Sequence, residues 1–314
     1  MTAGPAPTHS EVSPGTEGIV AEGIGTGAIS TEAVRAVVQE RYAAAARTTL
    51  DLLDGGGSAK GSCCGTSCCS EPAGADPITR DLYKPEDAPS EGALIASLGC
   101  GNPTLLADLQ PGQTVLDLGS GGGLDVLLSA RRVAPGGTAY GLDMTPQMLE
   151  RARRNQTEAG GVENATFLLG TIEAVPLPDE SIDVVISNCV INLSPDKDAV
   201  LGEAFRVLRP GGRFAVSDIV LLRPIPAELV GVVGLWTGCV SGALVDSDYL
   251  AKLGEAGFVD ASIEVTRSYD RLDLEELASS LAPGELADGF NVAAIVAALE
   301  GTFASASIRA TKPR

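Results

Sequence analysis

Histidine, basic side chains and aromatic side chains are scarce in this sequence of 314 residues. The single histidine, His9, lies in an N-terminal segment rich in Gly, Pro and Thr, which we expect to be disordered. Without an ordered imidazole, a Ser-His-Asp triad, a histidine-based zinc site and a histidine general base are all disfavoured. Aromatic residues make up only 4% of the chain, against 44% hydrophobic residues, so the core must be aliphatic.

Positive charge is also in short supply, with 22 Lys and Arg against 41 Asp and Glu and a formal net charge of −19. Such a surface repels nucleic-acid phosphates and anionic lipid headgroups, so we expect neither nucleic acid nor a membrane as a partner. The longest uncharged stretch, residues 229–245, is shorter than the roughly 20 apolar residues of a membrane span. No basic stretch followed by an apolar run opens the sequence, which predicts a cytoplasmic protein without a signal peptide.

The length fits one α/β core with additions. We expect residues 1–29 to be a disordered tail, and residues 30–89 to contain a helix, a Gly-rich linker and a Cys-rich loop. Residues 90–220 are expected to form the core, and residues 221–314 a smaller C-terminal region.

From about residue 114, short aliphatic runs alternate with helical patterns. Strands are expected at 114–118, 138–143, 166–169, 182–187 and 213–219, and helices at 123–133, 146–159 and 196–208. This alternation predicts a doubly wound, mostly parallel sheet with helices on both faces. The Arg209-Pro210-Gly211-Gly212 sequence predicts a helix stop before the fifth strand. A helix near 247–256, a strand near 262–268 and an alternating run at 304–311 are expected to follow.

The first expected strand runs into a glycine-rich turn that opens a helix. The pattern is Asp117-x-Gly119-x-Gly121-x-Gly123, in which glycines let the backbone turn sharply and approach a ligand closely. The dinucleotide fingerprint G-x-G-x-x-G is not met, because the sixth residue counted from Gly119 is Leu124. A carboxylate just before the turn repels a pyrophosphate but can pair with a cationic amino-acid group.

A second acidic residue, Asp143, ends the next expected strand, where a carboxylate is suited to bind ribose hydroxyls. The two features favour S-adenosyl-L-methionine over a nicotinamide dinucleotide, and a structural turn in another Rossmann-like protein is the alternative. The block resembles class I S-adenosylmethionine-dependent methyltransferases, whose fold is Rossmann-like and doubly wound. The resemblance implies these cofactor-binding residues: Asp117, Gly119, Ser120, Gly121, Gly123, Asp143, Met144, Ile172, Glu173 and Asn188. Among them, Asp143 is implied to bind the ribose, and Ile172 and Glu173 to lie on the adenine side.

Seven cysteines are present, at positions 63, 64, 68, 69, 100, 189 and 239. In a cytosolic protein they should be mostly reduced, which indicates metal, metalloid or redox chemistry rather than structural disulfides. Cys189 follows the fourth expected strand, at the edge where open α/β sheets bind their substrates. Each cysteine taken alone is more often a small buried hydrophobe than a ligand.

Three segments together resemble the arsenite S-adenosylmethionine methyltransferases, and the resemblance covers about residues 30–311. They are Cys100-Gly101-Asn102, the string Ser187-Asn188-Cys189-Val190-Ile191-Asn192-Leu193, and residues 235–244 around Cys239. The resemblance implies that Cys189 and Cys239 hold trivalent arsenic and that Cys100 joins them or pairs with a fourth cysteine. That fourth cysteine corresponds to Cys69 or Cys68, and the vicinal Cys63-Cys64 pair is similar to bacterial members.

The chemistry agrees with this resemblance, because trivalent arsenic is soft and prefers thiolate ligands. The expected partners are arsenite or its thiol conjugates, methylarsenite, and a thiol reductant of the glutathione or thioredoxin type. A zinc site at Cys63, Cys64, Cys68 and Cys69 is disfavoured, because zinc-binding cysteine pairs are usually separated by a dozen or more residues. Two alternatives stay open: a C- or O-methyltransferase of a small organic molecule, and a non-catalytic arsenic-binding protein.

Overall fold

The computed structural model describes residues 31–54, 99–226, 240, 242–279 and 292–314. The tail, Gly-rich linker and Cys-rich loop expected from the sequence lie outside these residues. The described chain forms a seven-stranded sheet in the order β3-β2-β1-β4-β5-β7-β6. The strands are β1 Thr114–Leu118, β2 Thr138–Asp143, β3 Ala165–Leu169, β4 Ile182–Asn188, β5 Leu208–Leu221, β6 Val259–Ser268 and β7 Phe303–Thr311.

The sheet is doubly wound, as expected from the alternating pattern. Strands β1 to β5 pair in parallel, and β7 pairs antiparallel with both β5 and β6. The strand order reverses between β1 and β4, and in such sheets ligands bind outside the carboxyl ends of the strands at this reversal. The edge of the sheet at the carboxyl ends of β1, β2 and β4 is therefore where a site is expected.

Helices cover both faces of the sheet because its strands alternate their buried side chains between two cores. The helices are α1 Thr31–Asp54, α3 Pro103–Leu106, α4 Leu124–Val133, α5 Pro146–Glu158, α6 Lys197–Val207, α9 Asp246–Glu255, α10 Arg271–Ser279 and α11 Val292–Leu299. Leu116 of β1 packs in the cluster formed with α6 and α9, and its neighbour Val115 packs in a second cluster, with Val133 of α4. Within the ranges given above, no helix is both long and apolar enough to cross a bilayer.

Two features differ from the sequence expectations. The helix before β5 stops at Val207 as expected, but the Pro-Gly-Gly stretch is part of β5 itself, which starts at Leu208 and carries an irregularity in its pairing with β4. Gly211 takes a φ of 80° there, a left-handed value that favours glycine. The C-terminal run pairs antiparallel, and the helices α10 and α11 that precede it were not expected from the sequence pattern.

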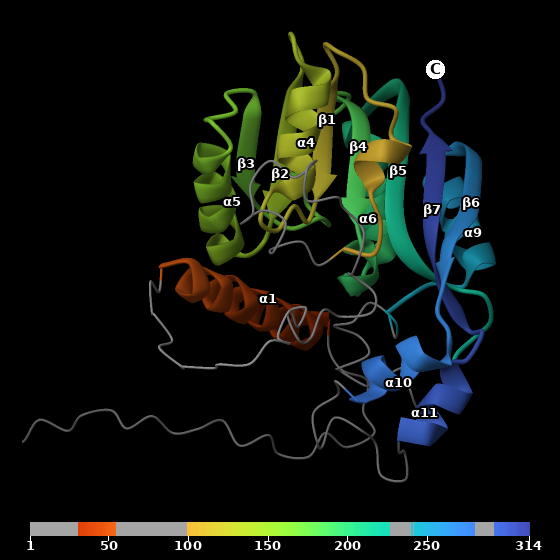
Figure 1. Cartoon of the computed structure of the whole chain (residues 1–314). Coiled ribbons are helices and arrows are strands. Elements are labelled where there is room, and N and C mark those ends of the chain that lie inside the picture. Colours follow the sequence, from red (N-terminus) through yellow and green to blue (C-terminus); the bar gives the residue numbers. More distant parts are fainter. Residues whose placement is uncertain (1–30, 55–98, 227–239, 241, 280–291) are drawn as a thin grey trace, which may run out of the picture.

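Three helices gather at the carboxyl edge of the sheet (Figure 1). Helix α1 lies across the carboxyl ends of the parallel strands, and α10 and α11 lie beside it near the start of β7. Their apolar side chains, including Val38, Leu274 and Ile295, share one buried cluster with Cys100 and Cys189. We call this group the carboxyl-edge cluster, and it brings the N-terminal helix and the C-terminal helices onto the same site.

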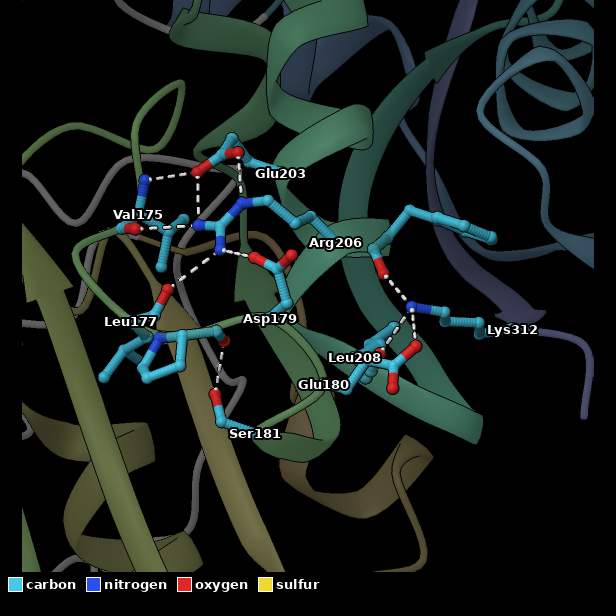
Figure 2. Close-up of polar contacts among 11 residues, drawn as sticks. Val175, Leu177, Asp179, Glu180, Ser181, Glu203, Arg206, Leu208 and Lys312 are labelled. Atoms are coloured by element: carbon cyan, nitrogen blue, oxygen red, sulfur yellow. Dashed lines mark hydrogen bonds and ion pairs between the residues drawn. The ribbon is translucent and has the colours of Figure 1, made fainter.

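The loop between β3 and β4 is fixed by Arg206 of α6 (Figure 2). Its guanidinium donates to the carbonyl oxygens of Val175 and Leu177 at 2.9 Å each, and to the carboxylates of Asp179 and Glu203. Hydrogen bonds from Arg206 lower the pKa of Glu203, whose other contact is the N–H of Val175 at 2.7 Å. The network matters for the site because the same loop, residues 170–181, carries Ile172 and Glu173.

We expect Arg206→Ala to lower the free energy of unfolding by about 2–4 kcal/mol, because it leaves two carbonyls and two carboxylates without their charged donor. Urea unfolding at pH 7 measures this loss. Arg209→Ala is the matched control, since Arg209 is more exposed and makes one ion pair, with Asp183. A loss of that size in both variants would contradict the role given to Arg206.

The Arg206 effect should also depend on pH. Because Arg206 lowers the folded-state pKa of Glu203, the pair contributes stability above the unfolded pKa of about 4.5 and loses it as the pH falls through the folded value. The difference between the native protein and Arg206→Ala should therefore shrink at acid pH.

Candidate functional site

A cleft runs along the carboxyl ends of β1, β2 and β4. It consists of two adjoining cavities of about 620 and 490 Å³, each partly open to solvent. We call them the Glu173 compartment and the Asp117 compartment after one wall residue of each. Tyr42, Gly119, Gly121 and Val190 line both, so the compartments form one elongated cleft.

The glycine-rich turn forms the floor shared by the two compartments. Gly119 and Gly121 have φ values of 74° and 49°, in the left-handed region that glycine adopts without strain. The N–H groups of Gly119 and Ser120 donate to the carbonyl oxygen of Leu142 at 2.8 and 2.9 Å, which ties the turn to β2. A Cβ built on Gly121 would meet no atom within 4 Å, so this position leaves space for a ligand.

Asp143, at the end of β2, lines the Glu173 compartment. Its carboxylate accepts the N–H of Gly121 at 2.9 Å and the N–H of Thr145 at 2.8 Å. Burial raises the pKa of Asp143, and these two N–H groups oppose the rise. The residue expected to bind ribose therefore also holds the glycine turn in place.

Asp117 and Ser120, both expected to bind the cofactor, line the Asp117 compartment. Burial raises the pKa of Asp117 well above its ordinary value, with further contributions from Asp125 and Asp143. A cationic group bound in this compartment would offset that accumulation of negative charge. The buried Ser120 hydroxyl has no hydrogen-bond partner among the described residues, which leaves it available to a ligand. Asp125 was missed from the sequence, although its place in the first turn of α4 is a usable signal.

Glu173, Ile172 and Met144 line the Glu173 compartment, and three further wall residues, Arg35, Val38 and Tyr42, come from α1. Glu173 accepts the Ser194 hydroxyl at 2.6 Å and forms an ion pair with Arg35 of α1 at 3.4 Å. Gln39 of the same helix donates to the carbonyl oxygen of Met144 at 3.1 Å. The cleft is thus closed on one side by a helix whose sequence carries no site motif.

One expected cofactor residue does not line the cleft. Gly123 precedes α4 with a φ of 84°, and a Cβ there would press against Phe167 and Ala152. Glycine at this position allows close packing of α4 on β3 and α5, and a contact of Gly123 with the ligand stays a prediction.

Cys100 and Cys189 meet at the carboxyl edge and are joined by a disulfide, with their Cα atoms 5.7 Å apart. Both side chains are 2% exposed. Cys189 has a φ of 61°, uncommon for a residue with a side chain and typical of functional positions. Its N–H donates to the carbonyl oxygen of Ser217 on β5 at 2.8 Å. The sequence analysis expected Cys100 either to join Cys189 and Cys239 or to pair with Cys69 or Cys68, and the structure brings Cys100 to Cys189.

A buried carboxyl group, that of Asp218, lies beside the two sulfur atoms. One of its oxygens and the sulfur atoms of Cys100 and Cys189 are all within 4.8 Å of one another. Burial raises the pKa of Asp218 to about 7, opposed by the N–H of Ile219 and the positive charge of Lys197. The sequence analysis did not single out Asp218, which lies within β5 and reaches the site because its neighbour Ser217 pairs with Asn188 at the end of β4.

The remaining thiol candidates, Cys239, Cys63, Cys64, Cys68 and Cys69, lie outside the described residues. Val240, which follows Cys239 directly, is buried in the carboxyl-edge cluster that contains Cys100 and Cys189.

Comparisons with known proteins agree with the cleft and its thiols. Residues 109–264 match a family model described as a methyltransferase domain. The arsenite methyltransferase of Halobacterium salinarum is 44% identical over 238 residues, which cover 72% of this chain and 58% of the relative. The human arsenite methyltransferase is 34% identical over 192 residues, covering 59% of this chain and 51% of the relative. This chain therefore spans less than two thirds of the length of these relatives.

Solved structures show the same fold. Phosphoethanolamine N-methyltransferase 2 of Haemonchus contortus, in complex with S-adenosyl-L-methionine, aligns with a TM-score of 0.53 at 17% identity, over 69% of this chain and 54% of that one. An arsenic(III) S-adenosylmethionine methyltransferase from Chlamydomonas reinhardtii aligns with a TM-score of 0.57 at 34% identity, over 71% of each chain. The fold is thus that of class I methyltransferases, and the chain belongs to the family of arsenic(III) S-adenosylmethionine methyltransferases.

Proposed function

We propose that this protein transfers the methyl group of S-adenosylmethionine to thiolate-bound trivalent arsenic, giving methylated arsenicals. The observation that carries the proposal is the buried pair Cys100 and Cys189 beside the cleft. Asn188 and Val190, on either side of Cys189, both line the Asp117 compartment, so a methionine end bound there would lie close to the thiols. The curated relatives named arsenite methyltransferases support the same assignment.

The cleft suits S-adenosylmethionine in shape and charge. We assign the adenosine part to the Glu173 compartment, where Asp143 can accept hydrogen bonds from ribose hydroxyls. The amino-acid part fits the Asp117 compartment, where buried carboxylates can pair with an ammonium group and the Ser120 hydroxyl can meet a polar atom. When bound, the cofactor would supply an electrophilic methyl group on its sulfonium sulfur.

The protein's own part in the reaction is to hold and orient arsenic. Thiolates of Cys189 and Cys239, with Cys100 as a third ligand for arsenite, would bind the metalloid and leave its lone pair free. That lone pair is the nucleophile, so no proton has to be removed from it and no histidine base is required. The carboxyl-edge cluster excludes water around the sulfur atoms of Cys100 and Cys189 and holds these two in one geometry.

The disulfide implies a requirement for reducing equivalents. Two thiols of glutathione or thioredoxin type would reduce the Cys100–Cys189 bond to two cysteine thiols and leave as a disulfide themselves. Only then can both sulfurs bind arsenic. We therefore propose a thiol reductant as a partner and the reducing cytoplasm as the site of action.

Arsenic speciation tests the proposal against its alternatives. The protein is incubated with S-adenosylmethionine, a thiol reductant and arsenite or methylarsenite, and cofactor consumption is followed with and without the arsenical. We expect consumption and methylated arsenicals only when the arsenical is present. Arsenic binding without cofactor consumption would instead indicate a non-catalytic binding protein. A methyltransferase of organic molecules would leave arsenite unmethylated.

We expect Tyr42→Ala to weaken binding of S-adenosylhomocysteine by roughly 1–2 kcal/mol, because Tyr42 is a wall of both compartments. Isothermal calorimetry measures the change. Val37→Ala, on the exposed side of the same helix, is the control and should leave the affinity unaltered. Equal affinities in all three proteins would remove α1 from the cofactor site.

A further inference from the structure

The side-chain amide of Asn188 lies between the cleft and the thiol pair. Its Oδ1 atom accepts the N–H groups of Cys100 and Gly101 at 2.9 and 3.1 Å. Its Nδ2 atom donates to the carbonyl oxygen of Gly101 at 2.7 Å and to a carboxylate oxygen of Asp125 at 3.3 Å. One side chain therefore connects the backbone around Cys100 to an acidic wall of the Asp117 compartment.

The surroundings of this amide leave it little freedom. A Cβ added to Gly99 would overlap the amide atoms of Asn188, so the segment before Cys100 passes directly over the side chain. On the other side, a Cβ added to Gly101 would overlap the Ser217 hydroxyl. The Cys100 segment is therefore packed tightly between Asn188 and β5.

The position of Asn188 in the chain extends its influence to the second thiol. It is the last residue of β4, paired with Ser217, and Cys189 follows it directly in a left-handed conformation. The Cys189 backbone is thus fixed by β5, whereas the Cys100 segment is held against it by the Asn188 amide. The distance between the two thiols depends on that amide.

We infer that Asn188 is a positioning residue that holds Cys100 against Cys189 and links the state of this thiol pair to occupancy of the Asp117 compartment. The inference rests on the proposed function only for the identity of the ligand that fills the compartment. A ligand there restricts the amide to the orientation in which it holds the Cys100 segment, which raises the effective concentration of one thiol at the other. By reciprocity, the disulfide form binds that ligand more tightly than the reduced form.

The positioning part is tested by the thiol–disulfide equilibrium in glutathione buffers. Two glutathione thiols reduce the bond and form one glutathione disulfide, and mass spectrometry of alkylated peptides measures the fraction of Cys100–Cys189 bond. We expect Asn188→Ala to lower the equilibrium constant for forming the bond at least about tenfold. Without the amide the Cys100 segment can move away, which lowers the effective concentration of the Cys100 thiol at Cys189. Gly99→Ala should do the same by pushing the intact amide aside.

Asn164→Ala is the matched control, because Asn164 also donates to two carbonyl oxygens, those of Ala130 and Gly137, but at the opposite edge of the sheet. It should leave the equilibrium constant unchanged. Gly99→Ala keeps the test decisive if Asn188→Ala fails to fold. An unaltered equilibrium constant in a folded Gly99→Ala protein would overturn the positioning role.

The linkage is tested with S-adenosylhomocysteine as the probe, titrated by calorimetry into the oxidised and the reduced full chain. We expect about fivefold or tighter binding to the oxidised form, and a ratio near one in Gly99→Ala and Asn188→Ala. A purely structural role would alter both affinities without removing their ratio. Equal affinities in the native protein, or a ratio that survives in both variants, would overturn the linkage. Absence of binding in both forms would contradict the proposed cofactor and the linkage, while the glutathione equilibrium still decides whether Asn188 positions Cys100.

Discussion

Replacing Cys189 with serine should reduce methylation of both arsenite and methylarsenite by at least about 100-fold while leaving cofactor binding intact. The substitution exchanges a soft thiolate for a hard hydroxyl, which holds arsenic poorly against competing thiols. Cys189 is buried at the carboxyl edge, next to two residues that line the cleft. We expect Cys239→Ser to behave in the same way. The measurement is product speciation for each variant with each substrate under excess reductant.

Cys100 provides the internal comparison, because its sulfur meets that of Cys189 but its proposed role is restricted to arsenite. Methylarsenite already carries one carbon and needs only two sulfur ligands, so Cys100→Ser should still methylate it and fail with arsenite. Replacement of Cys68 and Cys69 should likewise impair only the first methylation, and replacement of Cys63 and Cys64 should impair neither. Near-normal methylation of methylarsenite by Cys189→Ser would show that the arsenic site is misplaced.

Replacing Asp143 with alanine should weaken S-adenosylmethionine binding by about 1–3 kcal/mol, the range for a lost charge-assisted hydrogen bond. The structure adds a second cause, because Asp143 also accepts the N–H groups of Gly121 and Thr145 that shape the turn. Arsenite affinity without cofactor should stay nearly unchanged. Calorimetry with S-adenosylmethionine and with arsenite measures the two affinities separately.

Asp143→Asn distinguishes the charge of Asp143 from its role in the turn. The amide keeps one oxygen acceptor for a backbone N–H and loses the negative charge, so its cofactor affinity should lie between those of the native protein and Asp143→Ala. Cofactor binding of native strength in Asp143→Ala would remove the ribose assignment.

Local sequence pattern was sufficient to predict much of the fold and the part of the site formed by the glycine-rich turn and Asp143. The alternation of strands and helices predicted the doubly wound sheet, because the periods of buried residues belong to each element separately. The turn after β1 and Asp143 after β2 were identified because parallel strands all present their carboxyl ends at one edge. The same rule placed Cys189 beside the cleft. The glycine motif does not tell which glycine faces the cleft and which allows close packing, so the packing of Gly123 against Phe167 and Ala152 came only from the structure.

The sequence by itself thus determined the alternating strands and helices of the core and the glycine-rich turn, since each depends on residues close together in the chain. Only the tertiary structure decided that Cys100 meets Cys189, 89 residues away, and that Asp218 lies beside both. Only the tertiary structure likewise shows that Tyr42 of α1 lines the cleft and that β7 pairs antiparallel with β5. These features depend on how the elements pack and on single contacts such as the Asn188 amide, for which neither hydrophobic period nor motif spacing carries a signal.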